Sequence, residues 1–383
     1  MKKEHGTSSN GSGNNGRVIV IGGAGGFIGG ALTRYFQLKG FPRIRAVDKK
    51  PLALWYQRVP GVECLCMDLS QEENCVRACE GAMEVYNLGA DMGGMGFIEK
   101  FRIECLRSVL VNTHMIEAAY RAGADRYFFS SSACAYNVEL QKDPRPIALK
   151  ESDAYPAMAE RGYGWEKLFS EMVCQEYWAE RGLKTFVARF HNVYGPYGTW
   201  DGGREKAPAA ISRKVIEAKY KGTNEIHIWG DGSQARSYMF IDDCVKGIDM
   251  ITHCEDLIAT PINLGSNELV SVNELVDVVE DIAQVKLARI YEPDAPKGVA
   301  GRNSDNTMIK RVLGWEPHTL LREGMRKTYA WIDGEYLLRK SHEMSISENI
   351  QMAGLPFNGD VHTHPGARNQ PLRRQADGEA AHQ

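Results

Sequence analysis

The sequence predicts an α/β fold: a doubly wound parallel sheet with a smaller α/β lobe that faces a substrate. Three observations lead to this prediction. Short apolar, β-branched runs alternate with helical segments over residues 17–190, which is typical of buried parallel strands and their crossover helices. The first run leads directly into a glycine-rich turn. Near residue 191 the alternation gives way to a stretch rich in Gly, Pro and Trp, which indicates the loops of a second lobe.

The composition of the 383 residues is that of a globular protein, with 43% hydrophobic and 25% charged residues. A net charge of −3 gives no reason to expect a nucleic acid or an anionic membrane as partner. No apolar run approaches the ~18 residues of a membrane span, and the N-terminus lacks a signal-peptide core. Nine cysteines, an odd count, then predict reduced thiols and a cytoplasmic location. Their spacing predicts no zinc site; His362 and His364 could bind a stray metal ion, but a disordered tail is the favoured interpretation.

The N-terminal segment changes character at Arg17. Residues 1–16 are rich in Gly, Ser and Asn with almost no apolar side chains, so we expect a disordered leader. Residues 17–23 (RVIVIGG) predict a buried strand, and residues 31–40 predict a helix that ends at Gly40. The segment therefore has the order strand, glycine turn, helix.

The glycine turn has the spacing G-x-x-G-x-x-G, in which Phe27 and Ile28 separate Gly26 from Gly29, and Gly23 is the first glycine. Between a strand and a helix, this spacing predicts a tight turn that lets a pyrophosphate approach the backbone at the helix N-terminus. An ordinary glycine-rich turn is the alternative, and the acidic residue that follows weighs against it. We therefore predict a Rossmann-type dinucleotide site.

The second strand, residues 43–48, ends in Asp48 about 20 residues beyond the turn. A carboxylate at this place would accept hydrogen bonds from the adenosine ribose hydroxyls and repel a 2′-phosphate, which favours NAD over NADP. Lys49 and Lys50 follow directly and could weaken that preference. NAD is the expected cofactor.

Two further strands bring residues to the same edge of the sheet. Residues 62–69 place Asp68 to meet the adenine. Residues 83–91 run into a loop in which Leu88 would pass near the cofactor. Both follow because ligands of open α/β sheets bind outside the carboxyl ends of the strands.

The fifth strand, over residues 125–134, delivers Ser132 and Cys134 to its carboxyl end. Residues 184–190 predict the sixth strand, and residues 262–266 predict another. The polar end of the fifth strand is therefore a candidate reaction site.

The helix over about 162–182 carries Tyr163 and Lys167, which point from one helix face because they are four residues apart. A lysine ammonium beside a phenol stabilises the phenolate, so we expect the Tyr163 pKa below its usual 10 and a base for a sugar hydroxyl. Ser132 would hydrogen-bond the same oxygen. The pair alone is weak evidence, since Tyr and Lys on an amphipathic helix are usually a core-edge aromatic and a solvated charge.

These elements predict a division of the chain. The Rossmann domain would comprise residues 17–190 with a return segment at about 236–265. The substrate-binding lobe would comprise 191–235 and 266–338, and 339–383 would be a disordered polar tail.

Together, the glycine turn, Ser132, Tyr163 and Lys167 resemble extended short-chain dehydrogenases/reductases that act on nucleotide sugars. Longer strings closely resemble the GDP-mannose 3,5-epimerase family over about residues 17–335. These strings are 91–98 (DMGGMGFI), 132–134 (SAC), 189–192 (RFHN), 202–210 (GGREKAPAA) and 301–306 (GRNSDN).

The resemblance implies that NAD takes hydride from C4 of GDP-mannose while Tyr163, assisted by Lys167 and Ser132, takes the hydroxyl proton. The 4-keto sugar would have acidic hydrogens at C3 and C5. Cys134 and Lys206 would be the acid/base pair that removes and returns them. The products would be GDP-L-galactose and, if only C5 inverts, GDP-L-gulose.

The resemblance also implies a homodimer with a four-helix interface from the helices near 105–122 and 162–182. It further implies a set of substrate contacts along the sugar, diphosphate and nucleotide. These are Gly93, Met95, Ser132, Asn192, Glu205, Lys206, Lys214, Gln234, Arg236 and Arg302.

Structural roles are the alternatives for several of these residues. Cys134 alone would more often be a small buried hydrophobic residue, and Lys206 a solvated charge. Arg204 and Arg302 could be ion-pair partners instead of diphosphate contacts. Met95 could serve packing or line the sugar.

The chain also departs from the family at Gly89, at Asn137 and over residues 138–147, which puts the regiochemistry in doubt. A 4-epimerase or 4,6-dehydratase of a nucleotide sugar is therefore an alternative, although Ala133 and Cys134 stand where such a dehydratase carries acidic residues. An inactive NAD-binding regulator is a third alternative, and the retained Tyr163 argues against it.

Overall fold

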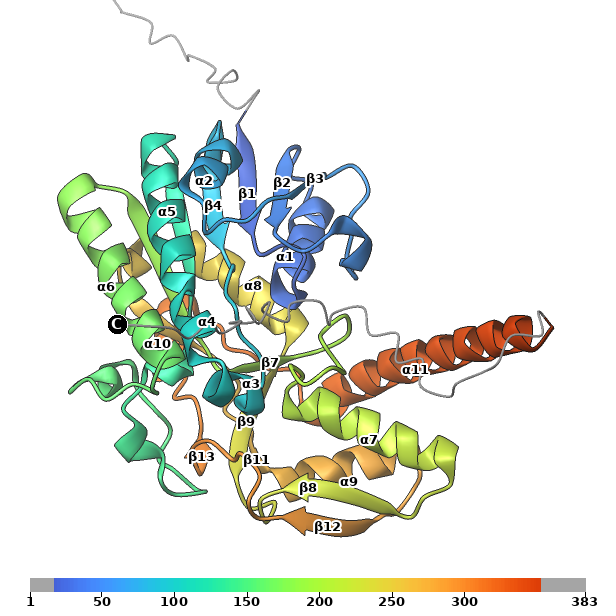
Figure 1. The fold of residues 1–383 in the computed structure, drawn as a ribbon. Coiled ribbons are helices and arrows are strands. Elements are labelled where there is room, and N and C mark those ends of the chain that lie inside the picture. The colour runs from blue at the N-terminus through green and yellow to red at the C-terminus, as the bar shows by residue number, and fades with distance from the viewer. Residues whose placement is uncertain (1–16, 353–383) are drawn as a thin grey trace, which may run out of the picture. The chain divides into compact units, whose positions relative to one another are not determined.

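Seven strands pair side by side in one parallel sheet, in the order β10-β6-β5-β4-β1-β2-β3. Figure 1 labels four of them, β4, β1, β2 and β3. The computed structural model describes residues 17–352. The α/β fold and its doubly wound parallel sheet are confirmed. The seven strands are β1 (Val18–Gly22), β2 (Ile44–Asp48), β3 (Glu63–Cys66), β4 (Ala82–Asn87), β5 (Arg126–Ser132), β6 (Lys184–Phe190) and β10 (Pro261–Leu264).

Helices cover both faces of this sheet because successive strand residues point to opposite sides. Val18 and Val20 of β1 pack in a core with α2, α5 and α6. Ile19 and Ile21 pack in a second core with α1 and α8. Near-continuous apolar strands are the expected result of burial on both faces. The helices are α1 (Phe27–Leu38), α2 (Glu72–Cys79), α5 (Ser108–Arg121), α6 (Tyr163–Arg181) and α8 (Ile241–Thr252).

The smaller lobe is built on two short sheets, drawn in the lower part of Figure 1. One has β9 (Ala235–Phe240) paired with β7 (Asn192–Tyr194), β11 (Leu269–Ser271) and β13 (Gly301–Arg302). The other pairs β8 (Glu225–Trp229) with β12 (Ala288–Glu292). Helices α7 (Ala207–Lys221) and α9 (Val272–Ala283) pack beside them. The core of this lobe is continuous with the α1 and α8 side of the large sheet.

The remaining helices connect or flank the lobes. These are α3 (Met95–Lys100), α4 (Arg102–Leu106), α10 (Thr307–Leu313), α11 (Leu321–Met352) and five single 3-10 turns at Leu52–Leu54, Ala133–Ala135, Val138–Gln141, Glu151–Ala154 and Glu255–Leu257. Helix α10, assigned from the sequence to the smaller lobe, packs beside β10 of the large sheet. Within residues 17–352, no helix is long and apolar enough to cross a membrane.

The C-terminal boundary differs from the prediction. Helix α11 continues past residue 339 to Met352, where the sequence predicts a disordered tail. The helix formers Lys, Glu, Met and Gln in residues 340–352 favour the helix over disorder. The predicted leader 1–16, the tail after 352 and its two histidines lie outside the described residues.

Candidate active site

The glycine turn lies at the carboxyl edge of the sheet, between β1 and α1. Gly23 has a φ of +79°, and a Cβ there would come within 2.7 Å of the Leu88 carbonyl group. A Cβ on Gly29 would overlap the Gly23 carbonyl oxygen. Glycine is therefore required at both positions, one for the turn and one for close packing of helix on strand.

A pocket of about 260 Å³ opens at this turn, and its lining fits a dinucleotide. The lining includes Gly23, Gly26, Asp48, Asp68 and Leu88, five of the predicted cofactor residues. Because α1 begins directly behind the turn, its unpaired amide N–H groups face a bound pyrophosphate. The predicted Phe27 and Ile28 are the first residues of that helix.

The acidic end of β2 is fixed by the backbone around it. Asp48 accepts hydrogen bonds from the amides of Gly25 (3.1 Å) and Lys50 (2.9 Å). The two lysines that could weaken a preference for NAD are both engaged. Lys49 pairs with Asp91 at 2.5 Å, and Lys50 donates to the Gly25 carbonyl at 2.8 Å.

The predicted reaction residues meet where β5 ends against the start of α6. Tyr163 lies beside Ser132, which interacts with its phenol, and the Ser132 hydroxyl accepts from the Cys134 amide at 3.2 Å. Lys167 lies on the same helix face, with its ammonium 5.3 Å from the Tyr163 ring centre. A Cβ on Gly164 would overlap the Cys134 carbonyl oxygen, so α6 approaches this turn as closely as glycine allows.

The expected lowering of the Tyr163 pKa is wrong for this structure. Burial raises the pKa of Tyr163 well above 10, with Cys134 and Glu166 adding to the rise and the interaction with Ser132 opposing it. The Lys167 ammonium lies 3.7 Å from the Glu166 carboxylate. Proton removal by Tyr163 therefore requires further positive charge beside the phenol, which the oxidised nicotinamide of NAD would supply.

Cys134 is buried in a small apolar cluster and touches an arginine. Its cluster neighbours include Tyr163, Phe97 and Cys105. Arg302 donates a hydrogen bond from Nη1 to the Cys134 sulfur at 3.4 Å. Burial and then Glu160 raise the pKa of Cys134, while Arg302 lowers it, and the net direction is upward. Burial therefore outweighs the cation beside the sulfur.

Lys206 immediately precedes α7 and faces the same region. It interacts electrostatically with Cys134 on one element and with Cys244 of α8 on another. Burial lowers the pKa of Lys206, and the Arg302 charge lowers it further. This agrees with the expected effect of burial on a lysine that exchanges protons.

The predicted substrate contacts fall into two groups. Met95 is the first residue of α3, and Gly93 lies two residues before it. The loop before α3 contacts the 204–206 segment, because the Gly94 amide donates a hydrogen bond to the Arg204 carbonyl at 3.0 Å. The Glu205 carboxylate is held by Arg213 at 3.1 Å.

The second group lies on the small lobe. Gln234 and Arg236 are adjacent to or part of β9, Asn192 begins β7, and Arg302 ends β13 opposite Arg236. Their side chains are engaged within the chain: Gln234 with the Trp229 carbonyl, Arg236 with the Ala300 carbonyl, Asn192 with the Ser237 carbonyl, and Lys214 of α7 with the His227 carbonyl. Their roles towards a nucleotide stay predictions.

Sequence reasoning missed the partners of Arg302. Its Nε donates to Gln141 Oε1 at 2.6 Å, and its Nη2 pairs with Glu160. Gln141 ends a single 3-10 turn and Glu160 lies in an irregular segment, and neither segment has a sequence pattern. Only the buried position of the arginine could have indicated that it needs an acid. Among the side chains that the structure describes, residues 17–343, no three His, Cys, Asp or Glu are arranged to hold a metal ion.

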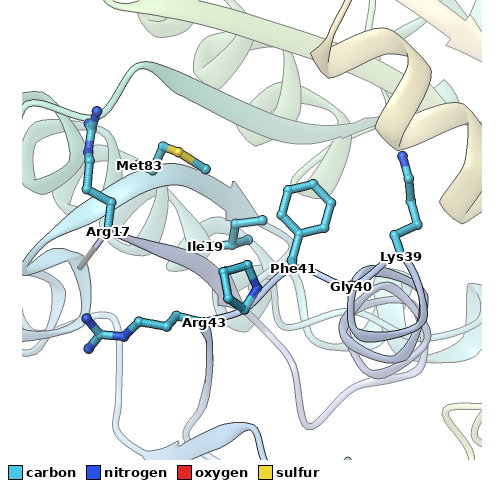
Figure 2. Close-up of a pocket in the computed structure, with 8 residues that line it drawn as sticks. Arg17, Ile19, Lys39, Gly40, Phe41, Arg43 and Met83 are labelled. Carbon is cyan, nitrogen blue, oxygen red and sulfur yellow. The ribbon is translucent and has the colours of Figure 1, made fainter. Parts of the chain in front are cut away.

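A second pocket, of about 270 Å³, lies at the opposite edge of the sheet, where the strands begin. Figure 2 shows Arg17, Lys39, Phe41 and Met83 around it. Arg17 pairs with Asp125 at 2.8 Å, and Lys39 pairs with Asp249 at 2.6 Å. Because ligands of this fold bind at the carboxyl edge, we place the cofactor at the first pocket.

Comparison with known proteins agrees with this geometry. Residues 18–265 match the NAD dependent epimerase/dehydratase family. GDP-mannose 3,5-epimerase of Arabidopsis thaliana is 42% identical over 330 residues, which is 86% of this chain and 85% of that protein. A GDP-mannose 3,5-epimerase 1 of Oryza sativa subsp. japonica is 40% identical over 361 residues, 94% of this chain and 91% of that protein.

The solved structure of MoeE5 in complex with UDP-glucose and NAD superimposes with a TM-score of 0.70 at 28% identity, covering 84% of this chain and all of that one. The overall fold is thus shared with a relative whose structure was solved with NAD bound. The chain belongs to the NAD dependent epimerase/dehydratase family and, within it, to the GDP-mannose 3,5-epimerases.

Proposed function

We propose that this protein epimerises GDP-D-mannose at C3 and C5 through a 4-keto sugar, yielding GDP-L-galactose and, when only C5 inverts, GDP-L-gulose. The observation that carries the proposal is the convergence of Cys134 and Lys206 on the Ser132–Tyr163 pair, in a chain 42% identical to a GDP-mannose 3,5-epimerase. A simple 4-epimerase needs only the tyrosine and the cofactor.

The roles of the side chains follow from their chemistry. When bound, NAD supplies a hydride acceptor and later the hydride donor at C4. Tyr163 takes the C4 hydroxyl proton, with Ser132 on the same oxygen and Lys167 behind it. A ketone at C4 acidifies the C3 and C5 hydrogens because it delocalises the carbanion. Cys134 and Lys206 then exchange those protons.

The test is to incubate GDP-mannose with the enzyme in D₂O and to locate deuterium by NMR. The proposal predicts label at C3 and C5. Label at C5 alone would restrict the reaction to the gulose branch, and label at neither carbon would overturn the proposal. A 4-epimerase or 4,6-dehydratase would instead convert the sugar without label at C3.

We further propose that the protein is a homodimer. On α6, Trp165, Phe169 and Met172 recur at spacings of four and three residues, and each is 44–45% exposed. Leu110 of the neighbouring α5 is also exposed. Three large apolar side chains on one helix face favour a second copy as the occupant, since such faces are normally buried.

Light scattering tests the dimer. The double variant W165E/F169E should be monomeric, because two carboxylates cannot be buried unpaired in an interface. W229E is the matched control, since Trp229 is 43% exposed on β8 of the other lobe, and it should stay dimeric. A monomeric wild-type protein would contradict the proposal.

A cytoplasmic location is also proposed, because all nine cysteines are free thiols.

A further inference from the structure

The guanidinium of Arg302 is held on three sides. Its side chain is 7% exposed, and its three nitrogens face three different partners. Nη1 donates to the Cys134 sulfur at 3.4 Å, Nε to Gln141 Oε1 at 2.6 Å, and Nη2 to Glu160. A planar guanidinium with each nitrogen engaged has little freedom to rotate. These partners therefore fix the position of the N–H group that donates to the Cys134 sulfur.

Glu160 holds Cys134 in a second way. Its backbone amide donates to the Cys134 carbonyl at 3.0 Å, and its own carbonyl accepts from the amide of Trp165 in the first turns of α6. The Glu160 side chain is 11% exposed, so its charge is not screened by bulk water. Glu160 therefore links the backbone of Cys134 to Arg302, the cation that contacts the Cys134 sulfur.

The Glu160 carboxylate is one of several charged groups around the Cys134 sulfur. Several ionisable groups on different elements interact with Cys134. They are Glu160, Arg302 of β13, Arg236 of β9, Lys206 before α7, Tyr163 of α6 and Cys105 of α4. The guanidinium groups of Arg302 and Arg236 carry positive charge, and the Glu160 carboxylate offsets it. Without that carboxylate, the cations would act on the thiol unopposed.

We propose that Glu160 is a positioning residue of the epimerisation: its carboxylate holds the Arg302 guanidinium on the Cys134 sulfur and balances the positive charge there. This inference rests on the proposed function, because it assigns Cys134 a proton to exchange. Glu160 itself touches neither the sugar nor the cofactor in this account. It acts through Arg302, which sets both the orientation of the thiol and the ease with which it loses its proton.

The test is the titration of Cys134, followed as thiolate absorbance at 240 nm and taken as the difference from the same protein carrying Cys134→Ser. Glu160→Gln keeps an acceptor for Arg302 but removes the charge, so the midpoint should fall by on the order of one pH unit. Glu160→Ala removes the acceptor as well and releases Arg302, so its midpoint should fall less. The pH profile of deuterium exchange should shift with the midpoint in Glu160→Gln.

Glu139→Gln is the matched control, because Glu139 carries the same charge in the neighbouring 3-10 turn but is 53% exposed in its pair with Lys142. It should leave the midpoint unchanged. An unchanged midpoint in Glu160→Gln would overturn the proposal. Equal falls in Glu160→Gln and Glu160→Ala would overturn the positioning role, since Glu160 would then act only as a charge. The titration needs no turnover, so a wild-type protein that exchanges no deuterium would overturn the proposed function separately.

Discussion

At the carboxyl edge of the central sheet, burial drives Tyr163, Cys134 and Lys206 towards their neutral forms, whereas at the amino edge ion pairs keep His253 and Asp249 charged. Burial raises the pKa values of Tyr163 and Cys134 and lowers that of Lys206 at the carboxyl edge. Neutral forms are the less costly ones in an apolar site, because no charge has to be desolvated.

The amino edge holds a network of five residues, with His253 at its centre, just after the end of α8. His253 lies 3.1 Å from Glu84 of β4 and 3.2 Å from Asp249, which also binds Lys39 and accepts from Tyr35 at 2.9 Å. Hydrogen bonds to Asp249 and Glu84 raise the pKa of His253 to about 10. Burial alone would raise the pKa of Asp249, but its hydrogen bonds from His253 and Lys39 lower it to about 2.

The difference shows how one sheet serves two purposes. A site that exchanges protons needs groups whose two protonation states are both attainable, and a fully paired charge is not such a group. The amino-edge network joins β4, α1 and α8 with fixed charges and has no reaction to perform. Buried ionisable groups at that edge are therefore assigned to stability, and those at the carboxyl edge to chemistry.

The largest effect is expected for Tyr163→Phe, which removes the hydroxyl and nothing else from the carboxyl edge. Without proton removal at C4 no ketone forms, so deuterium exchange at C3 and C5 should fall by about 10²–10⁴-fold together. The measurement is exchange by NMR, with NAD retention measured in parallel. Exchange near the wild-type rate would show that the base is another group.

Gly164→Ala should have the next largest effect. The added Cβ would overlap the Cys134 carbonyl oxygen, so α6 must move away from the turn that holds the thiol. A displacement of about 1 Å can cost about 10²-fold in rate, so we expect a loss of that order in exchange. Gly334→Ala is the control: a Cβ there meets nothing within 4 Å, and activity should be unchanged. Full activity in Gly164→Ala would mean that α6 can move relative to the turn at Cys134 without a loss of exchange.

The sequence predicts those features of the two edges that depend on neighbouring residues in the chain. The strands of the sheet, the glycine turn and the meeting of Ser132 with Tyr163 follow from β-branched runs and spacing, because these are local signals. The partners of Arg302 do not, since Glu160 lies 142 residues away in an irregular segment. Likewise, Glu84 and His253 are 169 residues apart. The direction of the Tyr163 pKa also escaped prediction, because burial is a property of the assembled fold.

His253→Gln tests the amino edge by its stability. It leaves the Glu84 carboxylate buried without its cation, but His253 is 37% exposed and partly screened. We therefore expect a loss of about 1–2 kcal/mol in the free energy of unfolding. The His253 pKa rises from 6.5 to about 10 on folding, so this contribution is complete below pH 6.5 and is lost as the pH rises to 10.

Urea unfolding of both proteins at pH 6 and pH 10 measures this difference. It should be largest at pH 6 and near zero at pH 10. His227→Gln is the control, because His227 also lies 2.9 Å from a glutamate, Glu292, but is 50% exposed. A difference independent of pH would show that the cost is packing rather than charge.

Lys39→Met should have the smallest effect, below about 1 kcal/mol, because Lys39 is 44% exposed and His253 still neutralises Asp249. The informative protein is the double variant K39M/H253Q. It leaves the Asp249 carboxylate, 9% exposed, without either cation, so the cost should exceed the sum of the single losses. Urea unfolding at pH 6 measures it. Additive losses would mean that the two cations act independently, and the amino edge would then be a set of separate pairs rather than one network.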